Sequence, residues 1–446
     1  MSKKFSIIVK KKLKDFNQTL SVDKDKSITH RAFFLASQCQ GISSIDGLES
    51  EDTFETINCL RNLGVRILKK KNKYFVFGNG IGSLRKFKNT IYCGNSGTTA
   101  RFFLGLLSTY QFPIKITGDA SLSKRPMGRV IKHINKIGAE IVEAKNKFNL
   151  PLVIQGTNYP LAQQHILDVP SAQVKTAILL SALGTLGTTE IVENFDTRDH
   201  TEILLKYLGA PIGIKKIGNK KIISLKGHHE MQSFDINVPP DPSNACFFIV
   251  QTLCMQKSKI KLKNVCINYF RTGFIDILNK MGAKIKIFNK RKIKGEYVAD
   301  ILVKSKKLKN ISVPKSIIPR TIDELPVLFI ICALSKGKAK FNGIAELRIK
   351  ESDRIAAMEK GLNVIGIKTK STRDTLTIYG NPKIKFQKKI SVSTNLDHRI
   401  AMSFFILGQA LGNYMTIKGF ESVNSSFPNF LKLQKKLGAK YEIKKN

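Results

Sequence analysis

The chain of 446 residues contains no tryptophan, only seven cysteines and less than half as many acidic as basic side chains. The cysteines are widely scattered and include no CxxC pair, which excludes a zinc-binding or disulfide framework. No apolar run approaches the roughly 18 to 20 residues that a membrane helix needs. We therefore expect reduced thiols, no secretory signal, no membrane partner and a cytoplasmic location.

The excess of basic side chains gives a formal net charge of +42, but aromatic residues make up only 8% of the chain. Because the lysines are spread along the whole length, neither a basic arm nor a stacking platform for nucleic acid stands out. A solvated lysine-rich surface that attracts small anionic substrates accounts for this composition better than nucleic-acid binding does.

One pattern recurs along the sequence: an amphipathic helical stretch, a glycine and then an alternating strand. The glycine stands where a left-handed residue ends a helix. Successive copies are 71 to 84 residues apart, which predicts a repeated supersecondary unit. Six copies are too many for one core, so we expect three in each of two domains, with the break near the prolines of 237–244. The six glycines are Gly64, Gly138, Gly209, Gly282, Gly366 and Gly438.

Two segments of the first half combine positive charge with a helix start. Segment 25–31 (DKSITHR) places Lys26 and Arg31 around Ser27, which we expect to cap the helix that follows. Segment 93–107 (CGNSGTTARFFLGLL) joins a glycine-rich turn to a helix N-terminus, a pattern typical of an anion nest, although the ending of a Walker loop is missing. For each segment taken alone, a helix start without a ligand remains the alternative.

Three further segments, 118–130, 170–177 and 196–202, carry groups suited to phosphate, carboxylate or hydroxyl contacts. These groups are Lys124, Arg125, Arg129, Ser171, Gln173, Lys175 and Arg198.

The second half places acids beside cations in segments 322–326, 346–355 and 396–404, each against a helical apolar run. Such pairs can supply an acid and a base with different pKa values, although helix caps and surface ion pairs explain any single one. The charged side chains are Asp323, Glu324, Lys350, Glu351, Asp353, Arg354, Asp397, His398 and Arg399.

Taken in order, DKSITHR, GDASLSKRPMGRV, SAQVKTA, TRDHTE, KESDRI and LDHRIAMSF resemble the motifs of the 5-enolpyruvylshikimate-3-phosphate (EPSP) synthase family from about residue 20 to 440. The resemblance implies a two-domain inside-out α/β barrel, with three βαβαββ repeats in each domain. Residues 22–240 would form the N-terminal (upper) domain, and residues 1–21 with 241–446 the C-terminal (lower) domain.

The reaction that the resemblance implies is transfer of the enolpyruvyl group of phosphoenolpyruvate to the 5-hydroxyl of shikimate 3-phosphate, through a tetrahedral intermediate and with release of phosphate. The family acts as a monomer on these two small anions and needs neither a metal nor an organic cofactor. It is the target of glyphosate, and Gly97 leaves room where an alanine methyl would intrude.

Motif matches carry the family's residue roles to this sequence. Asp323 would take the hydroxyl proton, Glu351 would exchange a proton with the methylene carbon, and Lys26 would assist them. The residues implied to bind shikimate 3-phosphate are Lys26, Ser27, Arg31, Ser171, Gln173, Arg198, Asp323 and Lys350. Those implied to bind phosphoenolpyruvate are Lys26, Gly97, Arg125, Gln173, Arg354 and Arg399.

The sequence departs from the family's pattern in two places. Ala172 cannot donate a side-chain hydroxyl, and Ser425-Ser426-Phe427-Pro428 stands where other members have Lys-Thr-Phe-Pro. Two other functions remain as alternatives: transfer to UDP-N-acetylglucosamine by the sister family, whose loop cysteine is missing between Gly118 and Arg129, and non-catalytic binding by a basic protein.

Overall fold

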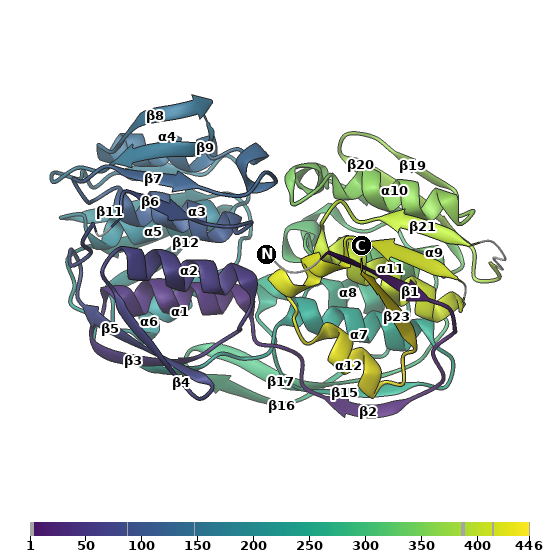
Figure 1. Ribbon diagram of the computed structural model, residues 1–446. Helices are drawn as coiled ribbons and strands as arrows, with labels where there is room; N and C mark the ends of the chain where they lie inside the picture. Colours follow the sequence, from purple (N-terminus) through teal and green to yellow (C-terminus); the bar gives the residue numbers. More distant parts are fainter. Residues whose placement is uncertain (1–3, 87, 147, 385–388, 413, 446) are drawn as a thin grey trace. The chain divides into compact units, whose positions relative to one another are not determined.

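The computed structural model describes residues 4–86, 88–146, 148–384, 389–412 and 414–445 (Figure 1). The chain forms two compact units. The N-terminal unit comprises Lys24–Val238 and the short turn Ile293–Glu296. The C-terminal unit comprises the chain up to Asp23, Pro239–Lys292 and the chain from Tyr297 onward.

The elements of the N-terminal unit alternate along the chain. Its helices are α1 (Lys26–Gln38), α2 (Glu51–Asn62), α3 (Gly97–Leu107), α4 (Gly128–Ile137), α5 (Ala172–Leu183) and α6 (His200–Tyr207), with a 3-10 turn at Leu122–Lys124. Its strands are β3 (Gln40–Asp46), β4 (Arg66–Lys70), β5 (Lys73–Asn79), β6 (Thr90–Tyr92), β7 (Ile114–Thr117), β8 (Glu140–Asn146), β9 (Asn149–Gln155), β10 (Gln164–Ile166), β11 (Thr188–Glu193), β12 (Ile212–Ile217), β13 (Lys220–Lys226) and β14 (Asp235–Asn237).

The C-terminal unit is built in the same way. Its helices are α7 (Pro242–Cys254), α8 (Gly273–Lys280), α9 (Leu325–Ala333), α10 (Arg354–Val364), α11 (His398–Leu411) and α12 (Phe430–Lys436), with 3-10 turns at Tyr269–Arg271, Lys315–Arg320, Ala345–Ile349 and Phe420–Ser425. Its strands are β1 (Phe5–Val9), β2 (Asn17–Leu20), β15 (Lys259–Cys266), β16 (Lys286–Ile293), β17 (Glu296–Lys304), β18 (Gly337–Asn342), β19 (Thr369–Ser371), β20 (Thr375–Gly380), β21 (Ile390–Ser393), β22 (Met415–Lys418) and β23 (Tyr441–Lys445).

The repeats predicted from the sequence appear as one sheet each. In the order β6-β7-β9-β8, the first two strands are parallel and the others antiparallel, and β10-β11-β13-β12 has the same arrangement. In the described part of the C-terminal unit, the sheet β18-β20-β19 has three strands, and its expected first strand is reduced to parallel bridges at Lys309 and Ser312. Each sheet with its two helices is therefore one βαβαββ unit.

Three strands pair away from their own repeats. β1 lies between β22 and β23 and completes the last sheet of the C-terminal unit. β2 pairs in parallel with β15, whereas β14 pairs in parallel with β3, so the first strands of the first and fourth repeats are exchanged. The two units are therefore each completed by strands that lie far away in the sequence.

All six glycines of the repeat pattern have a left-handed backbone, with φ between 78° and 108°. An L-residue with a side chain is strained there, and for four of these glycines a Cβ would meet no atom within 4 Å. Glycine is therefore required at these positions for its left-handed backbone conformation at the end of the helix, as the sequence pattern predicts.

Helices form the interior of each unit and the sheets lie outside them. In the C-terminal unit α7, α9 and α11 pack on one another, and every residue of α9 is buried. In the N-terminal unit α3 and α5 approach so closely that a Cβ on Gly105 would lie 2.1 Å from the Ala177 carbonyl oxygen. Apolar as these helices are, none within the described ranges is long enough to cross a membrane.

Candidate active site

The first residues of α1 carry Lys26, Ser27 and Arg31. The cap of this helix is Asp25, whose carboxylate accepts a hydrogen bond from the Ile28 N–H at 2.8 Å. The prediction that Ser27 caps the helix was wrong because the helix starts at Lys26, which places the Asp25 carboxylate at the capping position. The Ser27 side chain lies inside the first turn instead.

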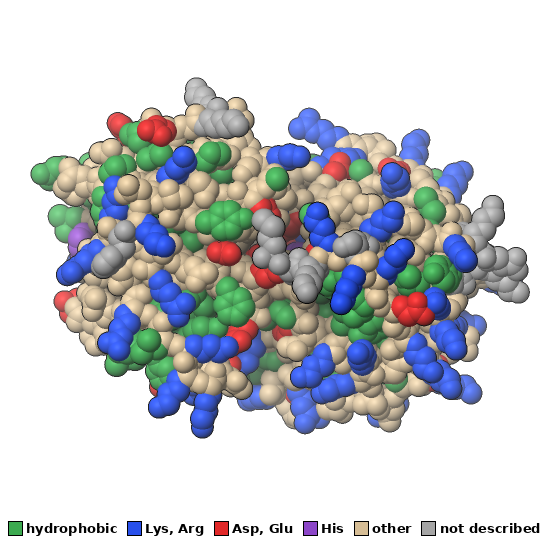
Figure 2. All heavy atoms as spheres, viewed as in Figure 1, with side chains coloured by type: hydrophobic (Ala, Val, Ile, Leu, Met, Phe, Trp, Pro, Cys, Tyr) green, Lys and Arg blue, Asp and Glu red, His purple; other side chains and the backbone are tan. Residues whose placement is uncertain are grey.

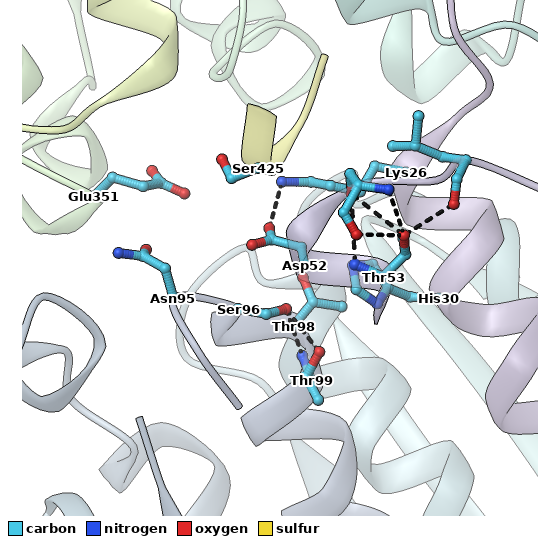
Figure 3. Close-up of polar contacts among 12 residues, drawn as sticks. Lys26, His30, Asp52, Thr53, Asn95, Ser96, Thr98, Thr99, Glu351 and Ser425 are labelled. Atoms are coloured by element: carbon cyan, nitrogen blue, oxygen red, sulfur yellow. Dashed lines mark hydrogen bonds and ion pairs between the residues drawn. The ribbon is translucent and has the colours of Figure 1, made fainter. Parts of the chain in front are cut away.

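Lys26 and Arg31 are both held by side chains of the N-terminal unit. The ammonium of Lys26 lies 2.8 Å from a carboxylate oxygen of Asp52 (Figure 3). The guanidinium of Arg31 donates hydrogen bonds to the hydroxyls of Thr201 at 2.7 Å and Thr176 at 2.9 Å. Arg31 is only 3% exposed, so its orientation is fixed by these neighbours.

The turn before α3 presents a helix N-terminus to nearby guanidinium groups. Ser96 caps α3 by accepting a hydrogen bond from the Thr99 N–H at 3.2 Å (Figure 3). A Cβ added to Gly97 would lie 2.8 Å from the nearest Arg101 nitrogen and 3.2 Å from the nearest Arg125 nitrogen. Free N–H groups of a helix and two arginines at one turn form a suitable environment for an anion.

Gln173 connects this turn to the start of α5. Its amide nitrogen donates to the Thr98 hydroxyl at 2.8 Å, and its amide oxygen accepts from Arg101 at 2.6 Å. Ser171 caps α5 by accepting from the Val174 N–H at 3.3 Å. The close packing of α3 on α5 at Gly105 brings these groups together.

Two further predicted groups of this unit, Arg198 and Lys175, lie in different environments. Arg198 is half-buried in the connection between β11 and α6. Lys175, in contrast, is completely buried and lies 2.6 Å from a carboxylate oxygen of Glu202. The expectation that Lys175 contacts a phosphate or hydroxyl of a ligand was therefore wrong, because its ammonium points into the protein.

A second group of predicted residues comes together in the C-terminal unit around Arg354, which is 1% exposed. Its guanidinium lies 2.6 Å from Glu351, 2.8 Å from Asp397 and 3.5 Å from Asp323. Burial alone would lower the pKa of Arg354, but the three carboxylates raise it. The group is therefore a charged cluster and not a set of separate surface ion pairs.

Asp323 has two further cationic neighbours in this cluster. The Lys350 ammonium lies 3.4 Å from its carboxylate, and the Arg399 guanidinium donates to its backbone carbonyl at 2.8 Å. Two carboxylates that share one arginine, with a lysine beside them, are suited to removing and delivering protons. Within the described ranges, no three His, Cys, Asp or Glu side chains are arranged to hold a metal ion.

Three residues outside the predicted ligand sets contact members of those sets. Arg101 lies one helical turn after Gly97 in the segment already singled out, so the helical spacing could have identified it. Asp397 was noted for its charge, but its pairing with Arg354 joins two distant segments. Asp52 gave no signal, since its contact with Lys26 depends on how α1 packs on α2.

The chain is similar to known proteins over nearly its whole length. Residues 10–433 match the family model of EPSP synthase (3-phosphoshikimate 1-carboxyvinyltransferase). The chain belongs to the EPSP synthase family. A 3-phosphoshikimate 1-carboxyvinyltransferase of Zymomonas mobilis is 40% identical over 441 residues, 98% of this chain and 97% of that protein. One of Ruthia magnifica is 41% identical over 420 residues, 94% of this chain and 95% of that protein.

Solved structures agree with this membership. An EPSP synthase from Acinetobacter baumannii superimposes with a TM-score of 0.85 at 38% identity, covering 98% of this chain and 99% of that one. The enolpyruvyl transferase NikO from Streptomyces tendae shares the fold, with a TM-score of 0.74 at 13% identity and coverage of 99% and 100%. The predicted fold class, an α/β architecture of the enolpyruvyl transferase type, is confirmed.

Proposed function

We propose that the two residue groups described above, one in each unit, serve a single reaction on two anionic substrates. The reaction is that of the family: the enolpyruvyl group of phosphoenolpyruvate is transferred to the 5-hydroxyl of shikimate 3-phosphate, and phosphate is released. The observation that carries the proposal is the cluster around Arg354, which holds Asp323 and Glu351 on one buried cation. A proton must be taken from a hydroxyl and another given to a carbon, and two such carboxylates meet both needs.

For shikimate 3-phosphate, the proposed ligands combine cations for the phosphate with polar groups for the hydroxyls. Support comes from the fixed orientation of Arg31 between two threonines and from the position of Ser171 at the start of α5. The proposed residues are Lys26, Ser27, Arg31, Ser171, Gln173, Arg198, Asp323 and Lys350.

For phosphoenolpyruvate, the proposed ligands of the N-terminal unit include residues at the turn before α3, and those of the C-terminal unit are two arginines. The absence of a side chain on Gly97 supports this, because a methyl group there would press on the guanidinium groups of Arg101 and Arg125. The proposed residues are Lys26, Gly97, Arg125, Gln173, Arg354 and Arg399.

In the proposed mechanism, Glu351 gives a proton to the methylene carbon of phosphoenolpyruvate while the 5-hydroxyl oxygen attacks the neighbouring carbon. Asp323 takes the hydroxyl proton, and the cations around it stabilise the tetrahedral intermediate. In the second step Glu351 removes a proton from the new methyl group, the bond to the phosphate oxygen breaks, and the departing phosphate takes up the proton held at Asp323. Lys26 neutralises charge on the substrates throughout.

We further propose that the N-terminal and C-terminal units correspond to the upper and lower domains of the family and that the chain acts as a monomer in the cytoplasm. All seven cysteines are free thiols, which supports a reducing compartment. Lysine and arginine side chains are scattered over the visible face in Figure 2, as expected for a solvated lysine-rich surface, and we propose no nucleic-acid partner.

The test is phosphate release by the purified protein, with each substrate omitted in turn. Release that needs both phosphoenolpyruvate and shikimate 3-phosphate is expected. Release with UDP-N-acetylglucosamine in place of shikimate 3-phosphate would favour the sister reaction. Binding of DNA or RNA that strengthens at low salt, without phosphate release, would favour the basic binding protein.

A further inference from the structure

A buried network of charges lies under the residues proposed to bind shikimate 3-phosphate. The Lys175 ammonium on α5 lies 2.6 Å from Glu202 on α6 and 3.4 Å from Glu193 at the end of β11. Lys221 of β13 lies 3.1 Å from Glu193, its partner in the strand register. Two lysines and two glutamates therefore balance one another, with Lys175 and Glu193 completely buried and Glu202 nearly so.

The network fixes α5, α6 and the segment between β11 and α6 relative to one another. The Thr197 hydroxyl, one residue before Arg198, donates to Glu193 at 2.7 Å. Ser171 and Gln173 stand at the start of α5, within two turns of Lys175. Residues of the network therefore stand close in the chain to residues proposed to contact the substrate. Lys175 follows Gln173, and Arg198 lies between Glu193 and Glu202.

A second contact between α5 and α6 lies directly beside the ion pair. Thr176, next to Lys175, and Thr201, next to Glu202, have their hydroxyl oxygens 2.6 Å apart. Both hydroxyls accept hydrogen bonds from Arg31. Any sliding of α6 along α5 would therefore move the acceptors that orient this arginine.

A buried ion pair is a poor means of stabilising a fold, because desolvation offsets most of the attraction and an apolar pair of similar size is often as stable. What it imposes is proximity, since a buried ammonium must stay close to a carboxylate, and this restricts the register of α6 against α5. Here that register sets the relative positions of Ser171, Arg31 and Arg198.

We propose that Lys175 and Glu202 are positioning residues for shikimate 3-phosphate, acting through the register of α5 on α6. This inference rests on the proposed function of the surrounding residues. Neither side chain touches the substrate, and the effect of the pair is on the geometry of the groups that do.

The test is the double variant Lys175→Met/Glu202→Leu, which removes one positive and one negative charge and leaves Glu193 paired with Lys221. We expect its melting temperature to stay within about 5 °C of the wild type, since an apolar pair replaces the ion pair. We expect KM and the calorimetric Kd for shikimate 3-phosphate to rise about tenfold, and KM for phosphoenolpyruvate to change less than about twofold. Wild-type values for shikimate 3-phosphate would overturn the inference.

Two further variants make the result unambiguous. Leu180→Ala, also buried on α5, should lower the melting temperature and leave KM for shikimate 3-phosphate unchanged. If it raises that KM as much as the double variant does, the effect is one of stability and the inference fails. If the double variant does not fold, Glu202→Gln decides: it keeps the shape of the side chain, and an unchanged Kd for shikimate 3-phosphate would count against positioning.

The outcome for the proposed function is separate. Failure of the wild type to release phosphate with both substrates would contradict the proposed function. An active wild type whose double variant binds shikimate 3-phosphate normally would contradict only the role of Lys175 and Glu202.

Discussion

Arg31 in the N-terminal unit and Arg354 in the C-terminal unit are almost equally buried, at 3% and 1% exposure, but they have different partners. The guanidinium of Arg31 donates to two threonine hydroxyls and to the carbonyl of Ser27. That of Arg354 is surrounded by the carboxylates of Glu351, Asp397 and Asp323. The same residue type is oriented by neutral oxygens in one unit and holds a group of acids together in the other.

The difference has a physical consequence for each arginine. Hydroxyl and carbonyl oxygens fix the direction of a guanidinium without cancelling its charge, so that charge can act on an anionic ligand. Carboxylates compensate the charge of a guanidinium, and the arginine in turn holds these acids together in a buried place. We therefore expect changes in the N-terminal group to affect mainly substrate binding, and changes in the C-terminal group to affect proton transfer and stability in addition to binding.

The largest effect should come from the two acids of the C-terminal group. Asp323→Asn and Glu351→Gln remove a proton acceptor or donor while keeping the shape of the side chain, so kcat should fall by about 10²- to 10⁴-fold with little change in KM. Steady-state kinetics with both substrates measures this. Equal losses in kcat and in affinity would contradict the proposed roles.

Asp353→Asn is the matched control for these variants. Asp353 lies in the same segment and caps α10 by accepting from the Ala356 N–H at 2.9 Å. Asparagine caps a helix nearly as well as aspartate does, so kcat should stay close to that of the wild type.

A large difference is also expected in stability. Arg354→Met leaves three carboxylates without their shared cation and should lower the free energy of unfolding by about 3 to 5 kcal/mol. Arg31→Met leaves hydroxyl groups, which should cost about 1 to 3 kcal/mol. Urea unfolding of both variants measures the difference. Equal losses in the free energy of unfolding would show that stability does not depend on whether a buried arginine contacts carboxylates or hydroxyls.

A smaller effect is expected where Gly97 meets the two arginines of the N-terminal group. Gly97→Ala must push the ends of Arg101 and Arg125 aside, which should raise KM for phosphoenolpyruvate about three- to tenfold. Glyphosate, which occupies the phosphoenolpyruvate site in this family, should inhibit the wild type and lose potency against the variant. Steady-state kinetics with varied phosphoenolpyruvate measures KM, and inhibition assays at fixed substrate concentrations measure the potency of glyphosate.

Gly213→Ala is a suitable control for this substitution. Its Cβ would lie 2.7 Å from the Ser224 hydroxyl, a contact as tight as the one at Gly97 but on the strand β12. Unchanged KM and glyphosate inhibition are expected, and a parallel rise in both variants would point to a general effect of added methyl groups.

The smallest effect is the dependence of stability on pH, and it arises in the N-terminal unit. His133 and His165 lie together there, with ring nitrogens 3.3 Å apart. Burial lowers the pKa of both from 6.5 to about 4, with His165 adding to the effect on His133. The unfolded chain therefore binds more protons between these values, so stability is complete above pH 6.5 and falls as the pH approaches 4.

Replacing both histidines by phenylalanine should reduce the loss of stability between pH 7 and pH 5, measured as the shift of the urea midpoint. His229→Gln, at an exposed position, should leave that shift unchanged. A double variant with the same pH dependence as the wild type would exclude the pair as a source of acid sensitivity.

Much of the fold could be predicted from the sequence, because its signals are local. The six glycines mark helix ends wherever the chain places them, since a left-handed backbone is a property of a few consecutive residues. The turn at Gly97, which we propose to bind an anion, was also recognisable, because the glycines, the capping Ser96 and the apolar helix are neighbours in the chain. The role of Lys175 could not be read in the same way, since a lysine that points inward has the same local sequence as one that points outward.

By itself, the sequence determined that the chain is a sixfold repeat of helices and strands, and that several short charged segments, where we propose the reactive residues, match one enzyme family. Only the tertiary structure decided that β2 and β14 are exchanged between repeats, that β1 closes the last sheet, and that Arg354 gathers three carboxylates. The physical reason is that strand pairing and ion pairing join residues far apart in the chain, and their energies depend on burial and distance, which no local pattern records.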